Sequence, residues 1–306
     1  MRIIILFVLT IVSHFIGLTA DFCDLPYGKH ERQRMNVHHV CAVGAPRPVL
    51  VFIHGGGWKG GCRTENPAPW LSELCRKRGF AFVSIDYRYL EDGRREGIFP
   101  PVRAPLDDVE TALRFIVSHA REWNIDKQRI GLTGGSAGAC SALIVALKDD
   151  NDLGVVAVGT RYPQTSLDPA EMRRWIPNIS YGAEAFGYSS FDEWLAHRSD
   201  VLRWIEHYSP ILLLKKCRSD RVPKFFMDSY SLEKEGPLPK DPTHAGMFRE
   251  KFREACRALG YEARDFAGDD YYDALLDCIS GGREHLQQVK RTGGNAIIGQ
   301  KEERTK

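Results

Sequence analysis

The chain has 306 residues, of which 43% are hydrophobic and 27% are charged. This balance suits one large globular domain or two small ones with a sizeable core, and it excludes disorder of the whole chain. The formal net charge is +2, and the basic residues are spread along the sequence. Composition therefore gives no sign of a nucleic-acid-binding surface and favours a small or neutral partner.

Residues 1–20 are typical of a secretory signal peptide. One Arg precedes a short apolar run that ends near Val12, and Gly17-Leu-Thr-Ala20 offers a cleavage site after Ala20. The run is too short for a comfortable transmembrane helix, so we expect an exported protein, periplasmic or secreted, without stable membrane insertion after cleavage. Because Leu18 is larger than the small residue usual at that position, an uncleaved N-terminal tether is the alternative interpretation.

Apolar, β-branched runs alternate with helical patterns through most of the chain. The runs typical of buried strands are Val49–Ile53, Ala81–Ile85, Ile130–Thr133, Val155–Val158 and Lys224–Met227. The pattern over Pro105–Glu122 predicts a helix with one apolar face, and places Asp107 and Asp108 in a first turn where the helix dipole favours acids. This alternation predicts an α/β fold, with a mostly parallel central sheet and helices on both faces.

Residues 161–210 depart from this alternation and show short helical patterns. They are rich in aromatic residues, among them Trp175, Tyr181, Phe186, Tyr188, Phe191, Trp194 and Trp204. Two interpretations compete: a packed excursion, and a lid-like insertion that lines a substrate cleft, which we favour. Residues 281–306 read as a solvated, poorly ordered tail, which leaves 21–280 as the main domain.

Eight cysteines follow Ala20, and none of them has Cys-x-x-Cys spacing. Since no paired histidines accompany them at ligand intervals, the sequence does not predict a structural zinc or another metal site. An exported chain can form disulfides, and the candidates are Cys23, Cys41, Cys62 and Cys75, with no pairing indicated. Cys140 lies in an apolar segment and is interpreted as a buried free thiol.

Arg129–Cys140 reads as a short strand, then Gly134-Gly-Ser-Ala-Gly138, then an Ala-rich helix. This order is that of a nucleophile elbow, a tight turn that needs small residues on both sides of the serine. A second glycine motif, His54-Gly-Gly-Gly-Trp58, follows an earlier predicted strand. Backbone N–H groups of Gly55, Gly56 and Ala137 are candidate donors to an oxyanion, because nothing bulky stands between such groups and a substrate.

The two motifs together closely resemble the esterase and lipase branch of the α/β-hydrolases, the hormone-sensitive-lipase-like and feruloyl-esterase-like enzymes. Ser84-Ile-Asp-Tyr-Arg88 and Trp123–Ile130 add to a similarity that is strongest over residues 24–150. The resemblance implies an α/β-hydrolase fold, with Ser136 as the nucleophile and Gly55, Gly56 and Ala137 as the oxyanion hole. It implies no cofactor.

The resemblance also implies an acid after the next-to-last strand, ahead of a helix that ends in Leu-Gly. Asp241 falls at the expected distance before the predicted helix Phe248–Leu259, and we favour it. Asp228, at the end of the strand, and Glu233 are rival candidates.

The match fails at the histidine. After Ala263-Arg-Asp-Phe266 the family usually has a Gly-x-Gly-His-like loop, whereas here Tyr271 stands near that place. Only His244 and His285 follow Asp241, and the chain order Ser, Asp, His is typical of this fold. We assign the base to His285 and keep His244 as the alternative.

Two functions from different classes follow. The first is an exported serine esterase that cleaves a carboxylic ester, with acyl groups on carbohydrates as candidate substrates, through an acyl-enzyme at Ser136. The second is a binding or scaffold protein whose chemistry has decayed, because the usual histidine position is not His. The intact elbow and glycines favour the esterase, and a protease is a weaker third candidate. The sequence does not indicate an oligomeric state.

Overall fold

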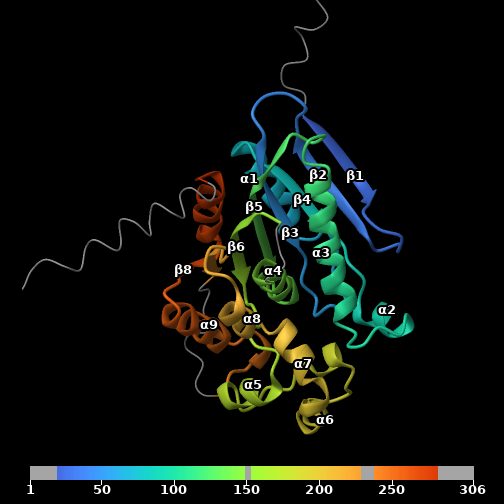
Figure 1. Ribbon diagram of the computed structural model, residues 1–306, viewed down its shortest axis with the longest axis vertical. Coiled ribbons are helices and arrows are strands. Elements are labelled where there is room, and N and C mark those ends of the chain that lie inside the picture. Colours follow the sequence, from blue (N-terminus) through green and yellow to red (C-terminus); the bar gives the residue numbers. More distant parts are fainter. Residues whose placement is uncertain (1–18, 149–152, 229–237, 282–306) are drawn as a thin grey trace, which may run out of the picture.

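One sheet of eight strands crosses the part of the chain described by this computed structural model, residues 19–148, 153–228 and 238–281 (Figure 1). The strand order is β1-β2-β4-β3-β5-β6-β7-β8. Strands β3 to β8 run parallel to one another, whereas β2 is antiparallel to both β1 and β4. The predicted mostly parallel α/β sheet is thereby confirmed.

The five predicted strands are β3 to β7 of this sheet, because continuous apolar runs suit strands that are buried on both faces. The strands are β1 (Ala20–Pro26), β2 (Arg34–Val40), β3 (Arg47–Ile53), β4 (Ala81–Ile85), β5 (Ile125–Gly135), β6 (Val155–Arg161), β7 (Lys224–Asp228) and β8 (Ala263–Phe266). The partly exposed β1, β2 and β8 carry polar residues and give no such run.

Helices cover both faces of the sheet, as predicted. They are α1 (Ala68–Lys77), α2 (Leu90–Arg95), α3 (Arg103–Ser118), α4 (Ala137–Leu147), α5 (Pro169–Trp175), α6 (Phe191–Ala196), α7 (Arg198–Tyr208), α8 (Pro210–Lys216) and α9 (Gly246–Ala258), and residues 271–281 are also helical. Alternate residues of β3 point to two separate cores. Leu50 and Phe52 join the core under α1 and residues 271–281, whereas Val49, Val51 and Ile53 join the one under α3, α4, α8 and α9 (Figure 1).

Helix α3 begins at Arg103, so Asp107 and Asp108 do not lie in its first turn, and that detail of the prediction is wrong. Asp108 is fully buried and accepts hydrogen bonds from the Arg88 side chain, at 2.6 Å from the nearer terminal nitrogen, and from the Arg88 backbone N–H at 2.8 Å. The guanidinium, rather than the helix dipole, balances this carboxylate.

The segment between β6 and β7 forms helices α5 to α8 and a short 3₁₀ turn, Ala183–Phe186. Helices α5 to α7 lie at one end of the sheet, whereas α8 packs beside α4 and α9 (Figure 1). Phe186, Phe191 and Trp194 are buried, and the rings of Phe186 and Trp194 stack with centroids 4.9 Å apart. Much of the aromatic surface predicted to line a cleft is therefore packed inside the segment.

Cys23, Cys41, Cys62 and Cys75 are free thiols, so the choice of these four as disulfide candidates is wrong. Cys140 is a buried free thiol, as predicted. The predicted signal peptide lies mostly outside the described residues, which begin at Thr19. Ala20 is the first residue of β1. The predicted tail also lies outside them, beyond Gly281. No helix in the described ranges is long and apolar enough to cross a membrane.

A side chain at Gly138 should destabilise the fold, because α4 and the end of β3 touch there through bare backbone. A Cβ atom at Gly138 would lie 2.1 Å from the Ile53 carbonyl oxygen and 2.5 Å from that of His54. We expect Gly138→Ala to lower the free energy of unfolding by about 1–3 kcal/mol, the usual cost of overpacking. Denaturant titration would measure it.

Gly246→Ala is the matched control for this substitution. Gly246 also lies in the first turn of a helix, but a Cβ atom at Gly246 would have no other atom within 4 Å. We expect this variant to be as stable as the parent or slightly more so. Equal stability of both variants would contradict a backbone contact at Gly138.

Candidate active site

Ser136 occupies the turn between β5 and α4. Its φ of 52° and ψ of −121° lie outside the regions favoured by L-residues. Its N–H donates to the Arg161 carbonyl at 2.8 Å, and its own carbonyl accepts from the Cys140 N–H at 3.0 Å. A Cβ atom at Gly134 would lie 2.5 Å from the Ile53 oxygen, so only glycine fits there. The structure thus has the strained, glycine-flanked turn that the sequence predicts.

The Ser136 hydroxyl lies 2.9 Å from Nε2 of His244. On the other side of the imidazole, Nδ1 lies 2.7 Å from Oδ2 of Asp241. Asp241 also caps the 3₁₀ turn Pro242–His244, where Oδ1 accepts from the Thr243 N–H at 3.1 Å. A hydroxyl, an imidazole and a carboxylate are therefore joined by two hydrogen bonds in a line.

The Asp241 carboxylate stays ionised at neutral pH. Burial acts to raise its pKa, but hydrogen bonds from the His244 ring and from the backbone N–H groups of His244 and Thr243 outweigh burial and lower the pKa below 3.8. An ionised carboxylate can only accept, so Nδ1 of His244 carries a proton. In the neutral ring, Nε2 is then free to accept the hydrogen of the Ser136 hydroxyl.

The structure brings together Ser136, Asp241 and the alternative histidine, His244. His285, the predicted base, lies outside the described residues, as does the rival acid Glu233. The other rival, Asp228, is buried at the end of β7, where it accepts a hydrogen bond from Nε of Arg161 at 2.7 Å. A sequence signal for His244 did exist: in Asp241-Pro-Thr-His244, an N-cap residue and a Pro at the first helical position start a tight turn.

Tyr271, which stands near the usual histidine position in the sequence, is not beside the serine. It is fully buried, and its hydroxyl lies 3.4 Å from that of Thr133 in β5. Its ring packs against Tyr272 with centroids 4.0 Å apart. Tyr271 is thus a core residue of the face covered by α1 and residues 271–281.

The glycine loop after β3 runs directly against the serine turn. A Cβ atom at Gly55 would lie 2.9 Å from the Gly135 carbonyl oxygen and 3.7 Å from the Cβ atom of Ser136. Gly56 has a φ of +90°, which favours glycine. At the end of the loop, the buried Trp58 indole donates to the Ser141 hydroxyl at 2.9 Å, which ties the loop to α4.

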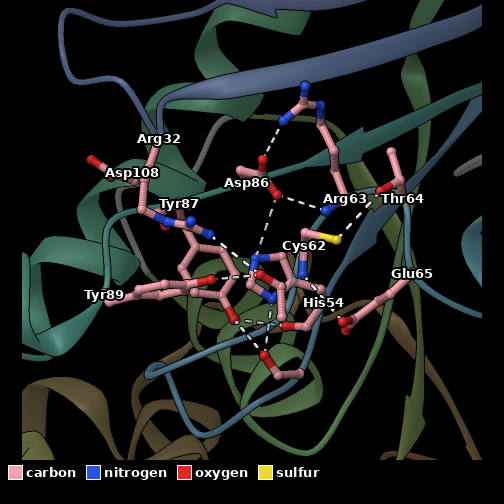
Figure 2. A network of polar contacts seen from close by, with 12 residues as sticks. Arg32, His54, Cys62, Arg63, Thr64, Glu65, Asp86, Tyr87, Tyr89 and Asp108 are labelled. Atoms are coloured by element: carbon pink, nitrogen blue, oxygen red, sulfur yellow. Dashed lines mark hydrogen bonds and ion pairs between the residues drawn. The ribbon is translucent and has the colours of Figure 1, made fainter.

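Tyr87 fixes the orientation of the loop's first two peptide groups (Figure 2). Its hydroxyl lies 2.7 Å from the carbonyl oxygen of His54 and 3.0 Å from that of Gly55. In a trans peptide the next N–H points opposite to the carbonyl, so the N–H groups of Gly55 and Gly56 point away from Tyr87. Burial raises the pKa of Tyr87 well above 10.0, which keeps this hydroxyl protonated.

The third predicted donor, Ala137, is the first residue of α4. The first N–H groups of a helix have no partner within the helix, so its amide is available to a ligand. Gly55 and Ala137 thus lie beside Ser136 on two different chain segments, and Gly56 follows Gly55 in the glycine loop.

The side chain of His54 packs against Tyr87 and the start of the glycine loop (Figure 2). Its ring stacks on Tyr87 with centroids 4.1 Å apart, and its Nδ1 lies 2.9 Å from the Gly55 carbonyl oxygen. Burial lowers the pKa of His54 to about 4, against opposing effects of the Gly55 carbonyl and of Asp86. The ring is therefore neutral at pH 7, with its proton on Nδ1, because a carbonyl can only accept.

Gly57 of the same loop lines a pocket of about 240 Å³, called the hollow below. Its polar lining comes from Ser180, Tyr181, Ser189 and Ser190, with the ion pair of Lys59 and Glu184, whose charged atoms are 2.6 Å apart. The hollow therefore joins the glycine loop to the segment after β6.

His54 should make the folded protein sensitive to acid. The unfolded chain binds the proton with the ordinary pKa of 6.5, but the folded state binds it only at about 4. The contribution of the neutral His54 ring to the free energy of unfolding is therefore fully present above pH 6.5. It is lost as the pH drops from 6.5 to 4, by a total on the order of 3 kcal/mol. Denaturant titrations across this range should show a shallower loss for His54→Gln. Equal losses in both proteins would contradict this role.

Comparisons with known proteins agree with the fold and the motifs. The sequence profile of the family described as BD-FAE matches residues 35–173. Esterase LipI of Mycobacterium tuberculosis is 27% identical over 53% of this chain and 48% of its own length, and carboxylesterase NlhH of the same species is 30% identical over 45% and 40%. A probable isoprenylcysteine alpha-carbonyl methylesterase of Oryza sativa subsp. japonica is 25% identical over 85% and 60%. The chain spans about half the length of these relatives.

Solved structures with a similar fold include a truncated carbohydrate esterase from gut microbiota, with a TM-score of 0.62 and 16% identity over 87% of this chain and 97% of the other. Esterase 2 of Thermogutta terrifontis has a TM-score of 0.58 and 20% identity over 94% and 96%. The fold, the two glycine motifs and these similarities agree. In its fold and in both glycine motifs the chain is similar to the esterase and lipase branch of the α/β-hydrolases.

Proposed function

We propose that the protein is a serine hydrolase that cleaves carboxylic esters through an acyl-enzyme at Ser136. The observation that carries this proposal is the line of hydrogen bonds from Ser136 to His244 at 2.9 Å and from His244 to Asp241 at 2.7 Å. A serine hydroxyl is a weak nucleophile until a neighbouring base accepts its proton, and both distances are within hydrogen-bond reach.

In the first step, Oγ of Ser136 attacks the ester carbonyl carbon while Nε2 of His244 takes the hydroxyl proton. The Asp241 carboxylate stabilises the imidazolium that forms. The N–H groups of Gly55, Gly56 and Ala137 donate to the carbonyl oxygen as it becomes an oxyanion. When the tetrahedral intermediate collapses, the imidazolium protonates the alkoxide, and the alcohol leaves an acyl group on Ser136.

In the second step, a water molecule replaces the alcohol. His244 takes a proton from this water as its oxygen attacks the acyl carbon, and the same amides hold the second oxyanion. Collapse breaks the bond to Oγ, His244 returns the proton to Ser136, and a carboxylic acid is released. Atoms balance without a metal or a cofactor.

The alternative, a binding or scaffold protein with decayed chemistry, rested on the missing histidine after β8. His244 offers an imidazole from a different loop, so this reason loses its force, and we favour the enzyme. A peptide substrate has no specific observation in its favour.

For the alcohol part of the substrate we propose a carbohydrate, held in the hollow beside Gly57. Three serine hydroxyls, the Tyr181 hydroxyl and the Lys59–Glu184 pair offer donors and acceptors to a ligand with many hydroxyl groups. The segment after β6 supplies most of this lining and would act as the lid. The carbohydrate esterase among the similar structures supports this class of substrate.

Substitution of either Ser136 or His244 by alanine should abolish turnover of p-nitrophenyl acetate, because the nucleophile or its base is lost. Asp241→Asn should lower kcat by about 10⁴-fold, since an amide can hold the imidazole in the wrong tautomer. The matched control is His207→Ala, at an exposed position of α7. If Ser136→Ala is inactive but His244→Ala keeps full activity, another base serves, and His285 is the next residue to replace. Equal activity of Ser136→Ala and the parent would overturn the proposed function.

Glu184→Ala should weaken the use of an acetylated oligosaccharide but not of p-nitrophenyl acetate, which lacks a sugar. Loss of a charged hydrogen-bond partner should raise KM for the sugar ester about tenfold. Glu206→Ala is the control, because Glu206 forms a similar exposed ion pair with Lys216, at 3.5 Å, outside the hollow. Equal effects on both substrates would argue against the carbohydrate assignment and leave the esterase intact.

A further inference from the structure

The base-bearing turn is held from outside by the segment that follows β6. Asp241 and His244 belong to one turn before α9, so no strand of the sheet fixes them directly. Nε2 of Gln164 donates to the Thr243 carbonyl at 2.7 Å, between the acid and the base. Nδ2 of Asn178 donates to the Pro239 carbonyl at 2.8 Å, just before the acid. The turn thus has a side-chain donor on each side of Asp241.

Gln164 is an unusual residue for its surroundings. Its side chain is 1% exposed, and within the described residues its Oε1 has no hydrogen-bond partner. A buried amide with an unpaired acceptor costs stability, and this cost accompanies the hydrogen bond that the same amide donates to the Thr243 carbonyl. The side-chain amide of Gln164 provides one hydrogen-bond donor, which points at the Thr243 carbonyl oxygen.

The Thr243 carbonyl is a sensitive point for the imidazole. Its peptide group leads directly to His244, so a rotation of this peptide would swing the ring relative to Ser136. Tyr162, two residues before Gln164, places its ring 5.7 Å from that of His244, so the same segment also contacts the base from the side.

We propose that Gln164 is a positioning residue for the base, one that holds His244 in line with Ser136 through the Thr243 carbonyl. This inference rests on the proposed function. Gln164 touches neither the serine nor, by this account, the substrate, and it acts only through the geometry of the turn. A displacement of about 1 Å at reacting groups can cost about 10²-fold in rate.

The test is Gln164→Met, which keeps an unbranched side chain and removes the donor. We expect kcat for p-nitrophenyl acetate to fall by about 10²-fold with KM unchanged, because proton transfer suffers and binding does not. The melting temperature should change little, because removal of the unpaired Oε1 offsets the loss of the hydrogen bond to the Thr243 carbonyl. A folded Gln164→Met protein with the kcat of the parent would overturn the proposal.

Thr165→Val is the matched control. Thr165 is the next residue in the chain, it is also fully buried, and its hydroxyl donates to a backbone carbonyl at 2.6 Å, but that carbonyl belongs to Phe248 inside α9. We expect this variant to lose stability and keep kcat. A loss of kcat in both variants, in proportion to their loss of stability, would mean that Gln164 only stabilises the fold.

Gln164→Ala keeps the proposal testable if Gln164→Met does not fold, because it removes the same donor without placing a longer apolar side chain against the turn. We expect kcat to fall by about 10²-fold, again with KM unchanged. A folded Gln164→Ala protein with the kcat of the parent would then overturn the proposal. Ser136→Ala is tested in parallel, because its activity depends on the proposed function and not on the role of Gln164. If Ser136→Ala is inactive but the Gln164 variant keeps its kcat, only the role of Gln164 is overturned.

Discussion

The candidate site depends on two backbone segments that touch without side chains between them. The end of β3 and the turn after β5 approach so closely that a Cβ atom at Gly55, Gly134 or Gly138 would lie within 3 Å of a backbone oxygen of the other segment. This contact sets the position of the loop amides relative to Ser136. Helix α4 begins at Ala137, directly after Ser136.

Polar contacts behind this junction hold one side of it rigidly. Tyr87, from the loop after β4, binds two consecutive carbonyls of the glycine loop, and Arg32 donates to the Tyr87 carbonyl at 2.9 Å (Figure 2). The same guanidinium lies 3.5 Å from the centre of the Tyr89 ring. The candidate oxyanion side of the site is therefore tied to the framework of the sheet, whereas the proposed base, His244, lies in a turn that neighbouring loops hold in place.

The sequence allowed prediction of the parts whose signal is local. Continuous apolar runs predicted β3 to β7, and the serine motif predicted a turn whose φ of 52° the structure shows. The mixed, half-exposed strands β1, β2 and β8 carry no such pattern. Asp108 was misread because a buried ion pair with Arg88, distant in the chain, decides its environment.

The candidate base was the hardest residue to predict, since the order of residues in a chain does not fix the distance between them. His285 was favoured over His244, although Asp241-Pro-Thr-His244 holds a capping residue and a proline that start a tight turn. The prediction relied on where the family usually has its histidine, and it gave little weight to the short turn that Asp241 and Pro242 start. The pairing of Ser136 with this turn bridges 108 residues and could be seen only in three dimensions.

A hydrogen-bonded acid and imidazole three residues apart form a unit of low contact order. Closing so small a loop costs little chain entropy, whereas a pair drawn from two separate loops must close a loop of many more residues. The geometry between Asp241 and His244 therefore does not depend on the register of β8 at the edge of the sheet. Changes in that strand or in the helical residues 271–281 can therefore occur without breaking the hydrogen bond between Asp241 and His244.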